Sequence, residues 1–275
     1  MEIGPTLVDA PRDAYSRPAP KLTILLPVRN EGVNLRIMLK ILPAVVEVPH
    51  EILVVYDFPE DDSVPVIQAM QANYSSLVGV QNTLGRGVIN ALRAGMKVAK
   101  GEYVLIFNAD EVAPVLAIDP MLKLVDSGCD FVGCTRYAYG GRRLGGSLIG
   151  GILSRSANLL FHYVAGSVLT DCTTGMKMFR RHVFDMLDLQ AKPVGWAVAF
   201  EMAIKAELAG LRLGEVPVIS IDRLYGGTST FRIGPWIREY SRWFFWGMRH
   251  LRSSSQRSRA RIVAPGRRSV TLKSY

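Results

Sequence analysis

Residues 103–112 read YVLIFNADEV, in which five strand-forming residues, Tyr103–Phe107, run directly into Asn108-Ala109-Asp110-Glu111. A solvated loop explains one acidic residue after a buried strand. A site for a cation and an anionic ligand explains a cluster of polar groups in that position. The rest of the sequence decides between these two interpretations.

Apolar runs of strand length alternate with segments of helical spacing on both sides of this stretch. Such alternation predicts βαβ units and an α/β fold, with a mainly parallel sheet flanked by helices. The helix over 34–42 is predicted to stop at Pro43. The predicted strands are 21–28, 51–56, 77–81, 103–107, 131–134 and 215–221, and the predicted helices are 34–42, 66–74, 87–99, 118–125, 197–209 and 235–251.

Polar residues follow three of the predicted strands. Ligands of parallel sheets bind beyond the carboxyl ends of the strands. Three convergent groups therefore favour one binding site over three unrelated solvated loops. The groups are Arg29-Asn30-Glu31, Asp57 with Glu60-Asp61-Asp62, and Asn108 with Asp110 and Glu111.

These residue types match the needs of a nucleotide-sugar site. Such a site needs hydrogen-bonding groups for a base and ribose, a hard cation for the diphosphate, and positive groups for the charge that develops on the leaving diphosphate. The candidates are Glu31 and Asp57 for the first, Asp110 for the second, and Arg136, Arg155 and Arg223 for the third. Alone, Asp57 is more often a turn residue or a helix cap.

The composition of the 275-residue chain is that of a globular protein, with 49% hydrophobic and 21% charged residues. The three cysteines and four histidines match no zinc-binding spacing, and the cysteine usage favours a reducing, cytosolic location. We expect no signal peptide and no transmembrane helix, because no apolar run reaches the length of a membrane span.

The net charge of +9 lies entirely at the C-terminal end, since nine Lys and Arg residues and no acidic residue follow Glu239. A basic tail favours an anionic surface, either lipid or nucleic acid, and the alternative is a disordered solubilising tail. Nucleic acid is disfavoured because Tyr275 is the one aromatic residue after Leu251.

The helix over 235–251 is amphipathic, and its apolar stripe fits either an anionic membrane interface or the chain's own domain. The stripe comprises Trp236, Ile237, Tyr240, Trp243, Phe244, Gly247, Met248 and Leu251. We expect a loose N-terminal arm (1–20), one catalytic domain (21–234), this helix (235–251) and a basic, disordered tail (252–275). The expected location is cytoplasmic, peripheral on the inner face of the membrane.

Seven stretches resemble family 2 glycosyltransferases of GT-A fold, in particular their polyprenyl-phosphate branch, of the dolichyl-phosphate mannose synthase type. They occur in family order over roughly residues 21–245. They are LTILLPVRNEGVNL, EILVVYDFPEDDS, LGRGVINALRAGMKVAKGEYVLIFNAD, GCDFVGCTRYAYGGRRLGG, LTDCTTGMKMFRR, FEMAIKAELAGLRLGEVPV and IDRLYGGTSTF. The resemblance implies inverting transfer of a hexose from a nucleotide-diphosphate sugar, of GDP-mannose or UDP-glucose type, to a polyprenyl-phosphate lipid.

The resemblance also implies a set of site residues. The nucleotide-sugar would contact Pro27, Arg29, Glu31, Asp57, Asn108, Ala109, Asp110 and Arg223. The catalytic residues would be Asp110, Arg136, Asp171 and Arg223, the acceptor phosphate would meet Arg136, Ser154 and Arg155, and Asp110 with Asn108 would hold Mg²⁺ or Mn²⁺.

Two departures from the family pattern leave alternatives open. Asn108 replaces the first aspartate of the metal motif, which implies weaker metal binding or none, and Gly150–Leu153 stand where the family often has basic residues, so phosphate capture would depend on Arg142, Arg143 or Arg155. The alternatives are a different acceptor on the same fold, or a nucleotide-sugar-binding protein with impaired catalysis. Glu201, within an apolar helix, is either a buried structural partner of an arginine or a catalytic acid.

Overall fold

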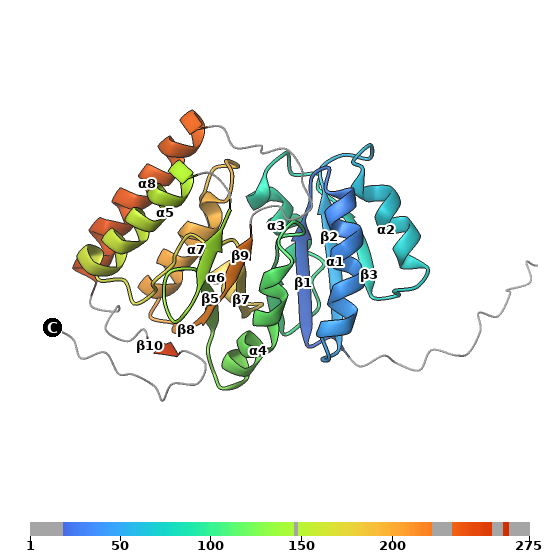
Figure 1. Ribbon diagram of the computed structural model, residues 1–275, viewed down its shortest axis with the longest axis horizontal. Coiled ribbons are helices and arrows are strands. Elements are labelled where there is room, and N and C mark those ends of the chain that lie inside the picture. The colour runs from blue at the N-terminus through green and yellow to red at the C-terminus, as the bar shows by residue number, and fades with distance from the viewer. Residues whose placement is uncertain (1–18, 146–147, 222–232, 255–260, 264–275) are drawn as a thin grey trace, which may run out of the picture.

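The computed structural model describes residues 19–145, 148–221, 233–254 and 261–263. A central sheet is covered by helices on both faces (Figure 1). Its strands are β1 (Leu22–Pro27), β2 (His50–Tyr56), β3 (Leu77–Gln81), β4 (Tyr103–Ile106), β5 (Phe131–Thr135), β7 (Lys177–Arg180), β8 (Arg212–Pro217) and β10 (Arg261–Val263). A two-stranded sheet pairs β6 (Arg142–Leu144) with β9 (Ile219–Ile221).

The helices are of three kinds. The α-helices are α1 (Gly32–Val45), α2 (Ser63–Gln71), α3 (Val88–Met96), α4 (Ile118–Asp126), α5 (Leu148–Leu160), α6 (Val183–Met186), α7 (Ala197–Leu208) and α8 (Ile233–Ser253). A 3₁₀-helix, η1 (Ala113–Ala117), precedes α4, and one π-helical turn, η2 (Phe161–Ala165), continues α5.

The strand order of the central sheet is β10-β8-β5-β7-β4-β1-β2-β3. Strand β7 runs antiparallel to both of its neighbours, while the other described pairs of this sheet are parallel. The predicted α/β fold with a mainly parallel sheet is therefore confirmed.

The core occupies both faces of the sheet. In β1, Leu22, Ile24 and Leu26 pack into one cluster with α1 and α4, whereas Leu25 packs into the other, which holds α3 and α7. A strand that is buried on both faces reads as a continuous apolar run, which explains why β1 and β4 stand out in the sequence.

Two predicted boundaries are wrong. Helix α1 contains Pro43 and continues to Val45, because a proline in the last turn removes a single backbone donor and only two residues follow it. The strand predicted over 215–221 is two strands in different sheets. Pro217 ends β8, and the chain then turns to pair β9 with β6.

Helix α8 directs its apolar stripe into its own domain, apart from the exposed Ile237, which decides between the two alternatives for this stripe. Trp243 and Leu251 are buried, and Gly247 lies against Phe161 of η2 and Ile204 of α7. In the part of the chain that the structure describes, no helix combines the length and the hydrophobicity needed to cross a bilayer.

Candidate active site

Three neighbouring strands, β4, β1 and β2, end at the same edge of the sheet. Their parallel register places the residues that follow them side by side, as the sequence predicts. Arg29 and Glu31 follow Pro27 at the end of β1, Asp57 follows β2, and Asn108 to Asp110 follow β4. All of these residues except Ala109 are partly exposed, and Ala109 is buried.

The loop after β1 is held by the acidic residues after β2. Asn30 adopts a left-handed backbone conformation, with φ of 53°, which turns the chain sharply into α1. The backbone N–H of Asn30 donates to Asp61 Oδ2 at 3.0 Å, and that of Gly32 donates to Asp62 Oδ1 at 2.8 Å. These two aspartates therefore anchor a loop, so the acidic run after β2 is partly structural.

Glu31 and Asp57 each contact an amide side chain. Asn34 Nδ2 donates to Glu31 Oε2 at 2.6 Å, and Asn82 Nδ2 donates to Asp57 Oδ1 at 2.8 Å. Hydrogen bonds of this kind fix the orientation of a carboxylate.

The Asn108 side chain lies between two elements. Its Nδ2 donates to Glu111 Oε1 at 3.4 Å, and a Cβ on Gly175, at the start of the segment leading into β7, would come within 3.2 Å of its Oδ1. Asn108 Oδ1 is buried and accepts no hydrogen bond. A buried amide oxygen without a donor fits a cation ligand.

A divalent cation fits this position through few protein ligands. The described residues hold no group of three or more His, Cys, Asp and Glu side chains that could bind a metal ion. Mg²⁺ is commonly held by one or two carboxylates together with substrate phosphates and water. Asp110 and Asn108 Oδ1 are therefore the residues that would hold such an ion.

Arg136 and Asp171 form a buried ion pair beside these strand ends. Arg136 Nε lies 2.8 Å from Asp171 Oδ2, and Arg136 Nη2 lies 3.1 Å from Asp171 Oδ1. Two parallel bonds of this kind fix the guanidinium plane. The Asp171 side chain is fully buried and that of Arg136 is 14% exposed, so water screens the pair little.

Asn158 and Thr173 complete the surroundings of Asp171. Asn158 Nδ2 donates to Asp171 Oδ1 at 3.1 Å and to Thr173 Oγ1 at 2.9 Å. Thr173 Oγ1 in turn accepts from Arg136 Nη2 at 2.8 Å. Asn158 is not among the site residues predicted from the sequence. Its spacing of four residues from Ser154 within α5 places both on one helix face, and this is the signal that would have identified it.

Asp171 is ionised and engaged in the structure. Burial alone would raise its pKa, but the Arg136 guanidinium outweighs burial and holds the pKa of Asp171 below its usual value. Both carboxylate oxygens accept hydrogen bonds from Arg136, so the arrangement suits Asp171 for orienting Arg136. The predicted catalytic role of Asp171 is thus most compatible with positioning.

Glu215 of β8 binds the backbone of the segment that carries Asp171. Its Oε1 accepts the backbone N–H groups of Thr170 and Asp171 at 2.9 and 3.0 Å, and its Oε2 accepts Thr170 Oγ1 at 2.7 Å. Burial raises the pKa of Glu215 to about 7, although these hydrogen bonds oppose the shift. Glu215 therefore holds the Asp171 segment in place through three hydrogen bonds.

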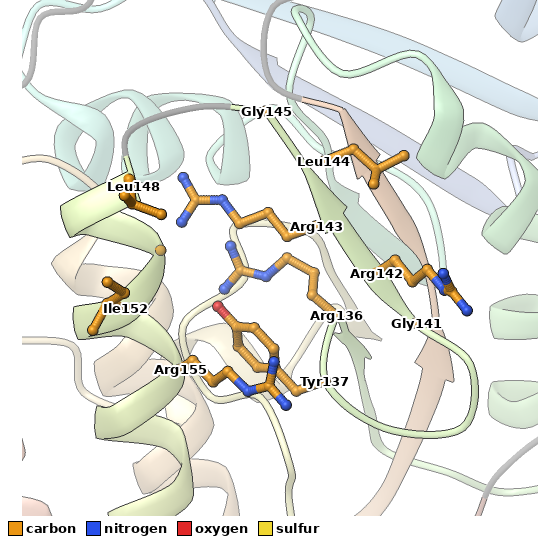
Figure 2. A pocket seen from close by; sticks show the side chains of 11 residues that line it. Arg136, Tyr137, Gly141, Arg142, Arg143, Leu144, Gly145, Leu148, Ile152 and Arg155 are labelled. Carbon is orange, nitrogen blue, oxygen red and sulfur yellow. The ribbon is translucent and has the colours of Figure 1, made fainter.

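A cavity of about 570 Å³ opens next to the Arg136 guanidinium. Figure 2 shows Arg136 and Arg143 extending toward α5, with Tyr137 and Arg155 beside them and Arg142 pointing away on the other side of β6. Leu144, Leu148 and Ile152 contribute apolar surface to the wall. The cavity thus combines guanidinium groups with an apolar side.

The structure places the other candidates as follows. Ser154 Oγ lies 3.4 Å from Arg136 Nη2 and 3.0 Å from the Tyr137 hydroxyl, so it belongs to the Arg136 cluster. Arg155 lines the cavity. Arg223 lies outside the described residues.

Glu201 is fully buried and does not belong to this site. It accepts hydrogen bonds from the backbone N–H groups of Gln190 and Ala191 at 2.6 Å each, and Lys205 Nζ lies 2.8 Å from its carboxylate. Glu201 is therefore structural, with a lysine rather than an arginine as its partner.

A family model described as Glycosyl transferase family 2 matches residues 23–187. This segment covers the strand ends, the Asn108–Asp110 motif, the Arg136–Asp171 pair and the cavity wall on α5. The matched stretch exceeds half of the chain.

Two curated relatives are undecaprenyl-phosphate 4-deoxy-4-formamido-L-arabinose transferases from two strains of Klebsiella pneumoniae. Each is 26% identical to this chain over 214 residues, which cover 76% of this chain. The aligned part is 62% of either relative, so the chain matches less than two thirds of their length.

Solved structures of glucosyl-3-phosphoglycerate synthase from Mycobacterium tuberculosis are similar in fold. A complex with Mn²⁺, UDP and glucosyl-3-phosphoglycerate has a TM-score of 0.63 at 16% identity, covering 83% of this chain and 80% of that one. A complex with Mg²⁺ and UDP has a TM-score of 0.61 at 17% identity, covering 83% and 79%. At this identity, the likeness shows a shared fold.

Proposed function

The chain belongs to glycosyl transferase family 2 and is a glycosyltransferase, and from this premise we propose that it transfers a hexose from a nucleotide-diphosphate sugar to the phosphate of a polyprenyl-phosphate lipid. The donor would lie at the ends of β4, β1 and β2, against Arg29, Glu31 and Asp57. The acceptor would lie in the cavity beside Arg136.

The composition of the cavity wall carries this proposal. Arg136, Arg143 and Arg155 supply positive charge for a phosphate, while Leu148 and Ile152 supply apolar surface for the first part of a hydrocarbon chain. Ser154 and Tyr137 add hydroxyl groups within hydrogen-bonding distance of each other. The named activity of the Klebsiella relatives, transfer to undecaprenyl phosphate, supports the same acceptor class.

The chemistry requires little acid–base assistance. An oxygen of the acceptor phosphate, already anionic at neutral pH, attacks the anomeric carbon, and the bond from that carbon to the nucleoside diphosphate breaks with inversion. The diphosphate leaves with the electron pair. The chain's residues therefore act by orienting the two phosphates and by stabilising charge. Asp171 holds the Arg136 guanidinium in place for this purpose.

A divalent cation, Mg²⁺ or Mn²⁺, is part of the proposal. Bound at Asp110 and Asn108 Oδ1, it would neutralise charge on the departing diphosphate. The M. tuberculosis structures contain Mn²⁺ or Mg²⁺ together with UDP, which supports a similar requirement on this fold.

The test incubates purified protein with bacterial lipid extract and radiolabelled UDP- and GDP-sugars, with and without Mn²⁺. We expect label from one donor to enter the organic phase, to be released by mild acid, and to be lost in Asp110→Ala. The matched control is Asp126→Ala, because Asp126 pairs with Lys21 at the surface and lies at the end of α4.

Other outcomes distinguish the alternatives. Label in a water-soluble product would mean that the chain is a transferase whose acceptor is a small phosphorylated molecule and not a lipid. The structures of the fold relative with phosphoglyceric acid make that the second candidate. The absence of transfer and of donor hydrolysis with every donor would refute catalysis and leave a nucleotide-sugar-binding protein.

A further inference from the structure

The solvent-facing side of α5 and η2 is apolar. Among the side chains of α5 and η2 whose burial the structure describes, nine are exposed, and seven of these are large and hydrophobic, with exposed fractions from 43% to 78%. Arg155 and Ser156 are the two polar exceptions. We call the seven the α5–η2 face, and they are Leu148, Ile152, Leu153, Leu159, Leu160, Tyr163 and Val164.

Helical geometry places the apolar residues of α5 on one side of that helix. Successive residues of an α-helix are rotated by about 100°, so positions 148, 152 and 159 of α5 lie along one stripe and 153 and 160 along the next, with Ser156 between the two stripes. Tyr163 and Val164 are exposed in the π-helical turn that follows. The opposite side of the same helix carries Asn158, Phe161 and Ala165, all buried. One side of this helix therefore packs inside the domain, and the other side exposes apolar side chains to solvent. Such a pattern indicates that the exposed side is covered by a surface outside this chain.

The neighbouring helix α8 exposes positive charge. The aromatic stripe lies on its buried side. Its exposed side carries four arginines and Phe245, which is 69% exposed. The arginines are Arg238, Arg242, Arg249 and Arg252. Within the described residues, Arg242 pairs with Glu239 at 3.2 Å, and no acidic residue follows Glu239 anywhere in the sequence.

The two helices form one flank of the molecule (Figure 1). Phe161 of η2 and Phe244 of α8 are in contact, with ring centroids 5.2 Å apart. An apolar helix face beside a row of arginines has the chemistry of an element that lies in the interface of an anionic bilayer.

We propose that the α5–η2 face and the arginines of α8 together dock this protein on an anionic phospholipid membrane. The apolar residues that contact the membrane would then be those of α5 and η2. The aromatic stripe of α8 packs inside the domain and would not contact the membrane. Leu148 and Ile152 belong both to this face and to the cavity wall, so docking would place the mouth of the arginine-lined cavity at the membrane surface. That last consequence rests on the proposed function, whereas membrane binding itself does not.

The test measures partition of the full chain onto sedimented vesicles, without donor or acceptor. Vesicles of phosphatidylcholine with phosphatidylglycerol are compared with phosphatidylcholine alone. Leu160→Gln with Tyr163→Gln should weaken binding to the mixed vesicles at least about tenfold, because apolar area no longer leaves water. The control, Leu116→Gln with Met186→Gln, alters side chains that are 77% and 49% exposed on other parts of the surface, against 77% for Tyr163 and 48% for Leu160, and should bind as the wild type.

The electrostatic part has its own variant. Arg249→Gln with Arg252→Gln should weaken binding to the mixed vesicles about 25-fold, at roughly fivefold for each arginine near an anionic surface, and should leave weak binding to phosphatidylcholine unchanged. Both double variants keep residues 254–275 intact.

Two results would overturn the proposal. Unchanged binding in both double variants would assign membrane attachment to another segment. The second result combines two observations. The wild-type chain would not bind vesicles but would self-associate in sedimentation velocity, and the variant Leu160→Gln with Tyr163→Gln would be monomeric. The α5–η2 face would then be a contact between two copies of the chain. Transferase activity is measured separately, so loss of the proposed reaction does not affect this result.

Discussion

Replacement of Asp171 by asparagine tests whether the Arg136–Asp171 pair organises the site. Asp171 is fully buried, and Arg136 is 14% exposed in its side chain. Asparagine keeps the size of the side chain and removes its charge. The change leaves a guanidinium with little access to water and without the carboxylate that pairs with it.

The structure contains a matched reference for the size of this effect. Lys21 and Asp126 lie 2.8 Å apart, the same distance as Arg136 Nε and Asp171 Oδ2, but their side chains are 33% and 45% exposed. Breaking a buried pair costs about 3–5 kcal/mol, whereas an exposed pair contributes about 1 kcal/mol or less. Because Arg136 keeps some exposure, we expect about 3 kcal/mol for Asp171→Asn, or a fall in Tm of about 6–12 °C.

The assay is urea unfolding of the wild type, Asp171→Asn, Arg136→Gln and the double variant, with Asp126→Asn as the control. We expect the double variant to lose clearly less stability than the two single losses added together, with a coupling of about 2 kcal/mol. Asp126→Asn should remain within about 1 kcal/mol of the wild type.

Equal, small losses for Asp171→Asn and Asp126→Asn would refute this reasoning. Such a result would mean that water reaches the Arg136 guanidinium in the folded state. Additive losses in the cycle would likewise show that the two side chains act independently, and Asp171 could then not be a positioning residue for Arg136.

Three further predictions concern pH, packing and the metal motif. Burial raises the pKa of Glu215 from its usual 4.5 to about 7, so the folded chain binds a proton that the unfolded chain releases, and stability should fall by about 3 kcal/mol as pH rises from 4.5 to 7. Glu215→Gln should flatten that slope in urea melts at a series of pH values. Gly247→Ala should cost about 1–3 kcal/mol, since its Cβ would lie 2.6 Å from Phe161 Cζ, while Gly234→Ala, with nothing within 4 Å, should not destabilise α8 in thermal melts. Asn108→Asp should lower the Mn²⁺ concentration for half-maximal transfer if Asp110 and residue 108 hold the ion; an unchanged requirement would place the ion elsewhere.

The fold followed from the sequence because its signals are local. Strands β1, β2 and β4 are buried on both faces and are short apolar runs with polar residues directly after them. Parallel strands share one carboxyl edge, so Glu31, Asp57 and Asp110 could be placed together without coordinates.

The sequence could not show which polar residues satisfy one another. Asp61 and Asp62 resemble ligand-binding residues in the sequence, yet they anchor the loop at Asn30 and Gly32. Arg136 and Asp171 are 35 positions apart, and their pairing depends on β7 lying antiparallel beside β5.

The amphipathic helices also separate what the sequence predicts from what only the packing decides. Periodicity alone identified the aromatic stripe of α8, because a helix repeats every 3.6 residues whatever it packs against. Only the tertiary structure decided that this stripe meets Phe161 and Ile204 inside the domain, and that the exposed apolar face belongs to α5 and η2 instead. The physical reason is that a sequence records how apolar each side of a helix is, whereas the three-dimensional packing determines which side finds a partner within the chain.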